Sequence, residues 1–489
     1  MQINDLPEEI LSNILLLATK ANEAEGVTFT YAVQHEPLTQ LRNPESKARE
    51  KYVRGPLPVE LVRWDSTFEI RHVCSAWHEW AAAYSFRDIY ERRWQGSEQW
   101  SSERWVDLTM NRKRYDLYEK NPASGLVAVR RDPFGSLKHT DRLFAEVPAV
   151  AKHVRRLWLN DFHDAASDRR MLSTVSSCPE LEILSVPWTV LRRGTAEDWI
   201  DLLNNNTGTG TPLKSLELKS LCLKKLPAQE LEADETPNPL RDPRVDFSAL
   251  ERLKIFGNTR HKPINDEDLH LIARTATNLH CLDFTNLSTI TVEGMLALVR
   301  ASAHSLRVLE HSPRSDDGFY HPDPGHIDAH ICALIAALPH LRDLSFSTPH
   351  MCAALFANHE VAWTGECQVR SLSLCGCNTP STTTAQKTDA LRAVFAAARR
   401  LIRARARLGH ELNIELFFAG CIFEPGKEIV HGDFALAEVG SGGQWPRAKG
   451  VSTKGPYGST GVYGRKEGSW EKVGEEEFLE AVGRGWVEI

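Results

Sequence analysis

The sequence lacks any run of about 18 apolar residues that could cross a bilayer, because its best early run, Ile14 to Ala18, ends at Thr19 and Lys20. Its start lacks a basic segment and a small-residue cleavage site, so it predicts no secretory signal. Ten cysteines are present without a CxxC pair, which favours reduced thiols over a disulfide framework or a zinc site. These absences predict a cytoplasmic or nuclear protein without a membrane partner.

Positive charge is not in excess, since 58 Lys and Arg face 65 Asp and Glu for a formal net charge of −7. That balance disfavours binding to nucleic-acid phosphates. No Ser/His/Asp, Cys/His or paired-carboxylate signature appears, so we expect no catalysis and no cofactor. His326 and His330 have a spacing that could hold a metal, but nothing completes a site, and we predict none.

Helix signals dominate the first residues. Asp5 can cap a helix, Pro7 fits its first turn, and Glu8 and Glu9 suit its positive end. A helix should begin near Leu6 and carry an apolar stripe of Ile10, Leu11, Ile14 and Leu15. A second amphipathic stretch is expected from Phe68 to about Tyr84, and helical spacing continues through Phe86, Ile89, Tyr90 and Trp94.

These two stretches resemble the halves of an F-box, Leu6-Pro7-x-x-Ile10-Leu11-x-x-Ile14 and Val73-Cys74-x-x-Trp77-x-x-Trp80-Ala81. The resemblance covers about the first 95 residues, with a loop inserted at about 21–66. It implies a small helical module that docks on the Skp-family adaptor of a cullin-RING (SCF-type) ubiquitin ligase. The adaptor-binding residues that it implies are Leu6, Pro7, Ile10, Leu11, Ile14, Val73, Cys74, Trp77 and Trp80.

A repeated phrase, apolar-x-x-apolar-x-apolar, recurs along residues 151–421 after an expected helical connector at 96–150 that also holds a strand candidate at 126–129. Successive phrases lie about 27 to 37 residues apart, which matches or exceeds the leucine-rich repeat period. The phrases begin at Val154, Leu181, Leu213, Leu250, Leu279, Leu306, Leu341 and Val369, with a ninth, less regular, at Leu416-x-Phe418.

Amphipathic helices are expected between the phrases, at residues 266–273, 292–299, 327–338 and 389–408. One strand and one helix cannot bury their apolar sides alone, so neighbouring units should stack into one core. We therefore expect an α/β fold. In it, we expect an N-terminal helical F-box-like module followed by an irregular leucine-rich-repeat solenoid, that is, a curved parallel sheet with helices on its outer side. This pattern is similar to the divergent solenoids attached to F-boxes.

The helix at 389–408 carries the most polarised charge of the chain, with Arg399, Arg400, Arg403 and Arg407 on it and Arg405 beside them. Two interpretations stay open. The arginines form the solvated outer face of a repeat helix, or they form a strip that binds anionic or phosphorylated target segments.

The last segment, 422–489, is rich in glycine. Short strands at about 434–439 and 461–473 and a helix at 475–482 predict a β-hairpin and a helix that cap the open edge of the solenoid.

Together these patterns predict a substrate-recognition adaptor of an SCF-type ubiquitin ligase. Its F-box would bind the Skp-family adaptor and its repeats would bind a protein target, whose identity the sequence does not give. One alternative is a leucine-rich-repeat scaffold without a ubiquitin role. Another is an enzyme whose site is assembled from distant loops.

Overall fold

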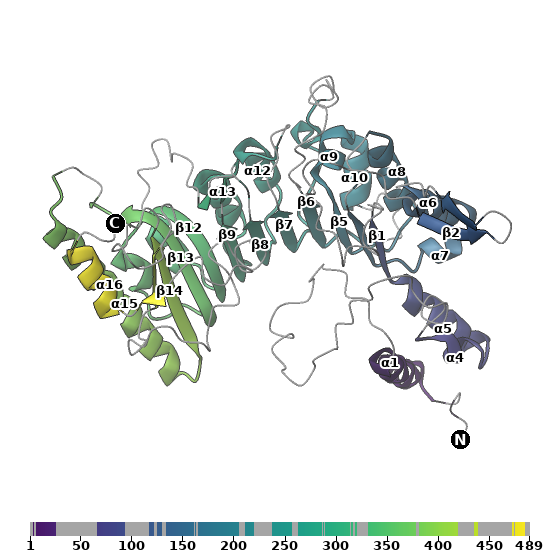
Figure 1. Ribbon diagram of the computed structural model, residues 1–489, viewed down its shortest axis with the longest axis horizontal. Coiled ribbons are helices and arrows are strands. Elements are labelled where there is room, and N and C mark those ends of the chain that lie inside the picture. Colours follow the sequence, from purple (N-terminus) through teal and green to yellow (C-terminus); the bar gives the residue numbers. More distant parts are fainter. Residues whose placement is uncertain are drawn as a thin grey trace. The chain divides into compact units, whose positions relative to one another are not determined.

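The chain of the computed structural model divides into two compact units. Figure 1 shows their helices and strands. Unit 1 comprises Met1–Trp158 with Ser173–Glu180, and unit 2 comprises Leu159–Leu172 with Leu181–Ile489. No helix among the described residues is both long and apolar enough to span a bilayer. The structure describes residues 3, 6–25, 66–92, 117–121, 125–129, 134–160, 162, 165–204, 211–219, 237–256, 263–285, 287, 289–312, 314–315, 318–319, 331–377, 381–418, 435–438, 472–473 and 475–484.

Unit 1 is mainly helical, with one short hairpin. The hairpin pairs β2 and β3 in antiparallel fashion, so the connector predicted at 96–150 is not purely helical, although β3 falls on the strand candidate. The elements are α1 (Glu8–Glu25), α4 (Phe68–Arg71), α5 (Ser75–Phe86), β1 (Asp88–Arg92), β2 (Leu117–Asn121), β3 (Gly125–Val129), α6 (Gly135–Glu146) and α7 (Pro148–Ala151).

The stretch predicted as one amphipathic run from Phe68 to Tyr84 is two helices. The chain leaves α4 after Arg71, and Cys74 is extended (φ −162°, ψ 173°) where it precedes α5. An extended residue ends the helical hydrogen-bond pattern, so Val73 and Cys74 lie in the turn between the helices. The helical spacing read into Ile89 and Tyr90 is also wrong, because both lie in β1.

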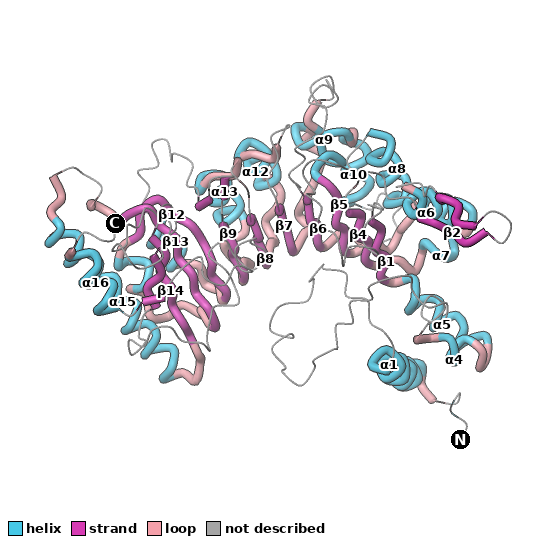
Figure 2. Tube along the Cα trace, in the orientation of Figure 1, coloured by secondary structure: helices cyan, strands magenta, loops and turns pink. Residues whose placement is uncertain are grey.

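A parallel sheet forms the centre of unit 2, with helices along one side (Figure 2). Each strand from β5 to β14 pairs in parallel with the next strand in the order β5-β6-β7-β8-β9-β12-β13-β14. The strands are β5 (Ile183–Pro187), β6 (Ser215–Lys219), β7 (Arg252–Phe256), β8 (Cys281–Thr285), β9 (Val308–Ser312), β12 (Asp343–Met351), β13 (Gly365–Leu374) and β14 (Leu412–Phe418).

Every repeated phrase overlaps a strand of the structure. The first phrase overlaps β4 (Arg156–Asn160), within which the chain passes from unit 1 to unit 2. The pairing places one apolar row on the side of the sheet that the helices cover, and a second row lies two residues further along each strand. The first row contains Leu184, Leu216, Leu253, Leu282, Leu309 and Leu344.

The last two phrases are out of register with this pattern. Phe346 pairs with Val369, which pairs with Leu416. Val369 is therefore the final apolar position of its repeat and not the first, and Leu372 is 39% exposed. The error arose because β13 is ten residues long and offers several apolar residues with the same spacing.

Two helices of unit 2, α12 (Asp266–Ala273) and α15 (Thr384–Arg407), begin with capping boxes. The side chain of Asn265 accepts from the Asp268 N–H and the Asp268 side chain accepts in return, which caps α12, and Thr383 and Gln386 do the same for α15. The remaining helices are α8 (Ala165–Ser176, shared between the units), α9 (Trp188–Arg193), α10 (Ala196–Asn204), α12 (Asp266–Ala273), α13 (Val292–Ala301), α14 (Ile331–Ala336) and α15 (Thr384–Arg407), with 3-10 turns η2 (Pro239–Arg241) and η3 (Ala353–Phe356). A two-residue pair, β10 (Arg314–Ser315) and β11 (Gly318–Phe319), follows β9.

At the carboxyl end, β15 (Ala435–Glu438) pairs antiparallel with β14, and β16 (Lys472–Val473) pairs parallel with β15. The predicted β-hairpin is therefore wrong, because these two strands run in the same direction. Helix α16 (Glu475–Gly483) packs on α15 through Phe478, whose ring centroid lies 6.2 Å from that of Phe395.

Candidate functional site

The first candidate site is the small bundle formed by α1, α4 and α5. Leu15, Ile70 and Ala81 form its buried centre, and Leu11, Trp77 and Trp80 pack against that centre half-buried. The apolar stripe predicted for the first helix is thus only partly turned inward.

Polar contacts hold the same three helices together. Trp80 Nε1 donates to Ser12 Oγ (2.9 Å), which joins α5 to α1. Arg71 Nη2 donates to Ser85 Oγ (2.8 Å), which joins α4 to α5. Asn22 Nδ2 donates to the Ser66 carbonyl oxygen (2.8 Å), so the carboxyl half of α1 is fastened as well. The bundle has its own internal core and cross-links.

A second apolar face of α1 points to solvent. Ile10, Ile14 and Leu17 recur at i, i+4 and i+7, the spacing of one helix face, and Leu17 is 67% exposed. Phe68 and Val73 are exposed on the α4 side. Of the large exposed apolar side chains among the described residues, most lie in this bundle or in the segments that flank its helices: Ile3, Ile10, Ile14, Leu17, Phe68 and Val73, against Val147, Leu372 and Leu408 elsewhere. We call Ile10, Ile14 and Leu17 the α1 stripe.

The predicted adaptor-binding residues therefore fall into two groups. Pro7, Ile10, Ile14 and Val73 are exposed. Leu6, Leu11, Cys74, Trp77 and Trp80 are half-buried. Leu17 and Phe68 were not predicted, although Leu17 follows Ile14 at helical spacing.

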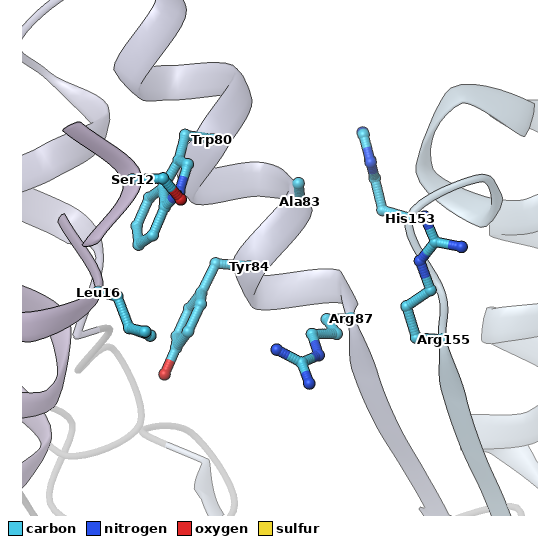
Figure 3. Close-up of a pocket in the computed structure, with 8 residues that line it drawn as sticks. All are labelled: Ser12, Leu16, Trp80, Ala83, Tyr84, Arg87, His153 and Arg155. Carbon is cyan, nitrogen blue, oxygen red and sulfur yellow. The ribbon is translucent and has the colours of Figure 1, made fainter. Parts of the chain in front are cut away.

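A cleft of about 260 Å³ lies beside the bundle within unit 1 (Figure 3). One wall is aromatic, because the rings of Trp80 and Tyr84 stack at a centroid distance of 5.3 Å and an interplanar angle of 11°. The opposite side carries the guanidinium groups of Arg87 and Arg155 together with His153. The other residues that line it are Ser12, Leu16 and Ala83.

The cationic side of the cleft is held in place by backbone bonds. The N–H groups of Arg155 and Arg156 donate to the Arg87 carbonyl oxygen (2.9 and 3.0 Å). Arg155 also pairs with Glu180. Desolvation, followed by the nearby charges of Lys152 and Arg155, lowers the pKa of His153, so His153 is neutral at pH 7. The cleft can accept a group with an aromatic or apolar part and an acidic part.

The second candidate site is a row of polar residues on the face of the unit 2 sheet opposite the apolar rows. Each member is the register partner of the next on the neighbouring strand, and each alternates with the two apolar rows along its own strand. We call this the polar row: Ser185, Glu217, Lys254, Asp283, Glu310, Ser345, Gln368 and Glu415.

Charges along the polar row lie close together. Lys254 Nζ is 3.4 Å from Asp283 Oδ2 and 3.9 Å from Glu217 Oε1. Burial opposes the Lys254 charge, but the carboxylates of Asp283, Glu217 and Glu310 outweigh it and raise the pKa of Lys254. Burial also raises the pKa of Asp283 to about 7.

Further along, the row is joined by hydrogen bonds. Gln368 Nε2 donates to Glu415 Oε2 (2.7 Å), and the fully buried Arg370 donates through Nη2 to Ser345 Oγ (2.8 Å) and Gln368 Oε1 (2.9 Å). Sequence reasoning missed this row. Its signal was the residue between the last two apolar positions of each phrase, which is polar or charged in most repeats.

The arginines of α15 are divided by the structure. Arg400, Arg403 and Arg407 are exposed, and Arg399 Nη1 lies 3.4 Å from Glu475 Oε2 on α16. Arg405 is buried, where its Nε donates to the Trp363 carbonyl oxygen (2.9 Å). The structure therefore separates an exposed strip of Arg400, Arg403 and Arg407 from Arg405, which is structural.

Among the residues that the structure describes, no group of three or more His, Cys, Asp or Glu side chains is arranged to hold a metal ion. His326 and His330 lie outside the described residues. No protein-family model, no curated protein and no solved structure matches the chain.

Proposed function

We propose that the chain is a substrate-recognition adaptor of an SCF-type ubiquitin ligase, with its N-terminal bundle as an F-box and unit 2 as a leucine-rich-repeat solenoid. The bundle binds the Skp-family adaptor, and the solenoid holds a protein target near the conjugating enzyme. The chain itself catalyses no reaction. Its contribution is to raise the local concentration of the target.

The α1 stripe carries this proposal. The exposed side chains of Ile10, Ile14 and Leu17 do not stabilise the bundle, because Leu11 and Leu15 already pack in its core. A contiguous exposed apolar patch marks a surface that a partner covers. A helix face with anchors at i, i+4 and i+7 fits a groove or a neighbouring helix of that partner.

The repeat architecture supports the second half of the proposal. The parallel sheet with helices along one side is consistent with a solenoid-like arrangement, and such arrays offer extended binding surfaces. The F-box-like motif and the repeats occur together in one chain, which is the combination expected of a target-recruiting subunit.

The test is co-purification of the full chain with a Skp-family adaptor. Ile10→Ser combined with Ile14→Ser should lower recovery of the adaptor at least about tenfold, since buried apolar anchors dominate such interfaces. Leu372→Ser combined with Leu408→Ser removes two exposed apolar side chains of unit 2 and should leave recovery unchanged. Circular dichroism should show that both variants stay folded.

Equal recovery of the adaptor by both variants would contradict the α1 stripe as the contact. Absence of adaptor binding by the folded wild-type chain would contradict the ubiquitin role altogether and favour the scaffold alternative.

A further inference from the structure

Three cysteine side chains from three separate elements meet in unit 2. Cys352 directly follows β12, Cys375 directly follows β13, and Cys332 lies in the first turn of α14. The thiols of Cys352 and Cys375 both lie within hydrogen-bonding reach of Cys332 and of each other. None of these three cysteines is joined in a disulfide in the structure.

The sheet brings Cys352 and Cys375 side by side. Met351 pairs with Leu374, and the Cys375 N–H donates to the Met351 carbonyl oxygen (2.8 Å), so the ladder continues to the cysteines. Neighbouring strands lie about 4.8 Å apart, which is within the Cα separation of roughly 4.4 to 6.8 Å that a disulfide requires.

A tight turn fixes the position of Cys375. The Cys377 N–H donates to the Leu374 carbonyl oxygen (3.0 Å), and Gly376 has φ +76°, as the third residue of a type II turn requires. Cys377 is buried beyond the turn. The turn therefore fixes Cys375 at the end of β13, next to Cys352.

The three thiols differ in access and in chemistry. Cys332 is fully buried, whereas Cys352 and Cys375 are half-buried. The Ala354 N–H donates to Cys352 Sγ (3.3 Å), which favours a thiolate there. The hydrogen bond with Cys332 lowers the pKa of Cys375, but the hydrogen bond with Cys352 and burial outweigh it and raise this pKa to about 11, so Cys375 stays a thiol at pH 7.

We propose that Cys352 and Cys375 form a peroxide-sensitive modification site in which Cys352 is oxidised first and Cys375 closes a disulfide with it. This inference is independent of the proposed ubiquitin role. The oxidant is hydrogen peroxide, and Cys332 remains reduced beneath the pair.

The steps balance. The Cys352 thiolate attacks one peroxide oxygen, an S–O bond forms, the O–O bond breaks, and the released hydroxide takes a proton to become water. Cys375 sulfur then attacks the sulfenic sulfur of Cys352, an S–S bond forms, and the departing hydroxide takes the Cys375 proton. Two thiols lose two electrons in total, and one peroxide becomes two waters.

The experiment treats the full chain with hydrogen peroxide, alkylates the remaining thiols, digests with trypsin and Glu-C without reductant, and analyses the peptides by mass spectrometry. A peptide containing Cys352 should be joined to one containing Cys375, free thiols should fall from ten to eight per chain, and dithiothreitol should reverse both changes. Trypsin alone is insufficient because Cys367 shares a tryptic peptide with Cys352.

Matched variants separate the pair from its neighbours. Cys375→Ser should abolish the linked peptide and leave Cys352 as a sulfenic acid that dimedone traps, whereas Cys377→Ser and Cys332→Ala should retain the link. Cys352→Ser should give neither the link nor a dimedone adduct at Cys375. If a variant unfolds, the linked peptide from the wild-type chain still tests the pairing of Cys352 with Cys375. A link that runs through Cys332 or Cys377, or oxidation of Cys352 without a link in the wild-type chain, would overturn the proposal.

Discussion

His311 lies beside Phe284 on the neighbouring strand, in the second apolar row of the unit 2 sheet, and is 1% exposed. Burial lowers the pKa of His311 to about 4, against an ordinary value of about 6.5. Between these pH values the unfolded chain binds a proton that the folded chain does not. His311 therefore lowers the free energy of unfolding as pH falls from about 6.5 to 4.

Asp283, on the strand next to His311, acts in the opposite direction. Burial raises its pKa from 3.8 to about 7, so between these values the folded chain holds a proton that the unfolded chain has lost. Asp283 therefore lowers the free energy of unfolding as pH rises from about 4 to 7. In the wild-type chain the two effects oppose each other over nearly the same pH range.

Single substitutions should reveal each effect. Replacing His311 with Phe, the residue found at 284 and 346 of this row, should leave a free energy of unfolding that falls as pH rises from about 4 to 6.5 more steeply than in the wild type. Asp283→Asn should give a rise over the same range. Each pKa unit corresponds to about 1.4 kcal/mol, so the two variants should diverge by a few kcal/mol. Urea denaturation across this range measures the slopes, and equal slopes in all three proteins would contradict the burial of both charges.

The core of the N-terminal bundle can be tested against its exposed stripe. Leu15 is 2% exposed and Leu17 is 67% exposed on the same helix. Leu15→Ala should cost about 2–5 kcal/mol of local stability and speed amide hydrogen exchange through α1. Leu17→Ala should leave exchange in α1 unchanged. Similar protection in both variants would mean that Leu15 is not part of a packed centre.

Gly294 in α13 lies against Asp266, the first residue of α12. A Cβ at this position would collide with the Asp266 side chain, whose Oδ1 accepts from the Thr291 N–H (2.8 Å). Gly294→Ala should therefore destabilise unit 2 by about 1–3 kcal/mol, although helix propensity alone favours Ala by about 1 kcal/mol. Glu293→Ala, at the exposed neighbouring position, is the control and should change stability by less than about 0.5 kcal/mol. A stabilised Gly294→Ala variant, measured by urea denaturation, would show that the helices separate without cost.

Arg405 and Arg403 lie on one helix and should respond differently to truncation. Arg405 donates to the carbonyl oxygens of Trp363 (2.9 Å) and Ala362 (3.3 Å), so Arg405→Ala leaves buried acceptors unpaired and should cost about 2–4 kcal/mol. Arg403→Ala should change the free energy of unfolding by less than about 0.5 kcal/mol. Thermal and urea denaturation of the two variants distinguish the buried guanidinium from the exposed strip, and equal losses would refute the difference.

The strands of unit 2 were predictable because each phrase packs apolar residues at period two next to a helix with period 3.6. Leu216, Leu253 and Leu282 were predicted in strands and are register partners. The predicted register failed where a strand is long, because β13 carries two apolar pairs with period-two spacing, Cys367 with Val369 and Leu372 with Leu374, on opposite faces of the strand. Only pairing with β12 selects Val369 as the partner of Phe346.

The candidate sites were predictable to a smaller extent. The apolar stripe of the first helix was read from its spacing, but spacing cannot say which side of the stripe faces the bundle. Leu15 turns inward and Ile14 outward because Trp80 fastens α1 through Ser12. The sequence around Cys74 contains no proline or glycine, so it does not predict the break between α4 and α5. The three thiols come from positions 332, 352 and 375, and it is the register of β12 on β13 that brings Cys352 beside Cys375.

The polar row also constrains how the chain can fold. A slip of one residue between neighbouring strands would turn every side chain of the slipped strand to the other face. In unit 2 such a slip would place Lys254, Asp283 or Glu310 in the apolar layer between the sheet and the helices. Burying an unpaired charge there has a large free-energy cost. The polar row therefore helps to select the strand register, because a misaligned sheet is less stable than the correctly paired one.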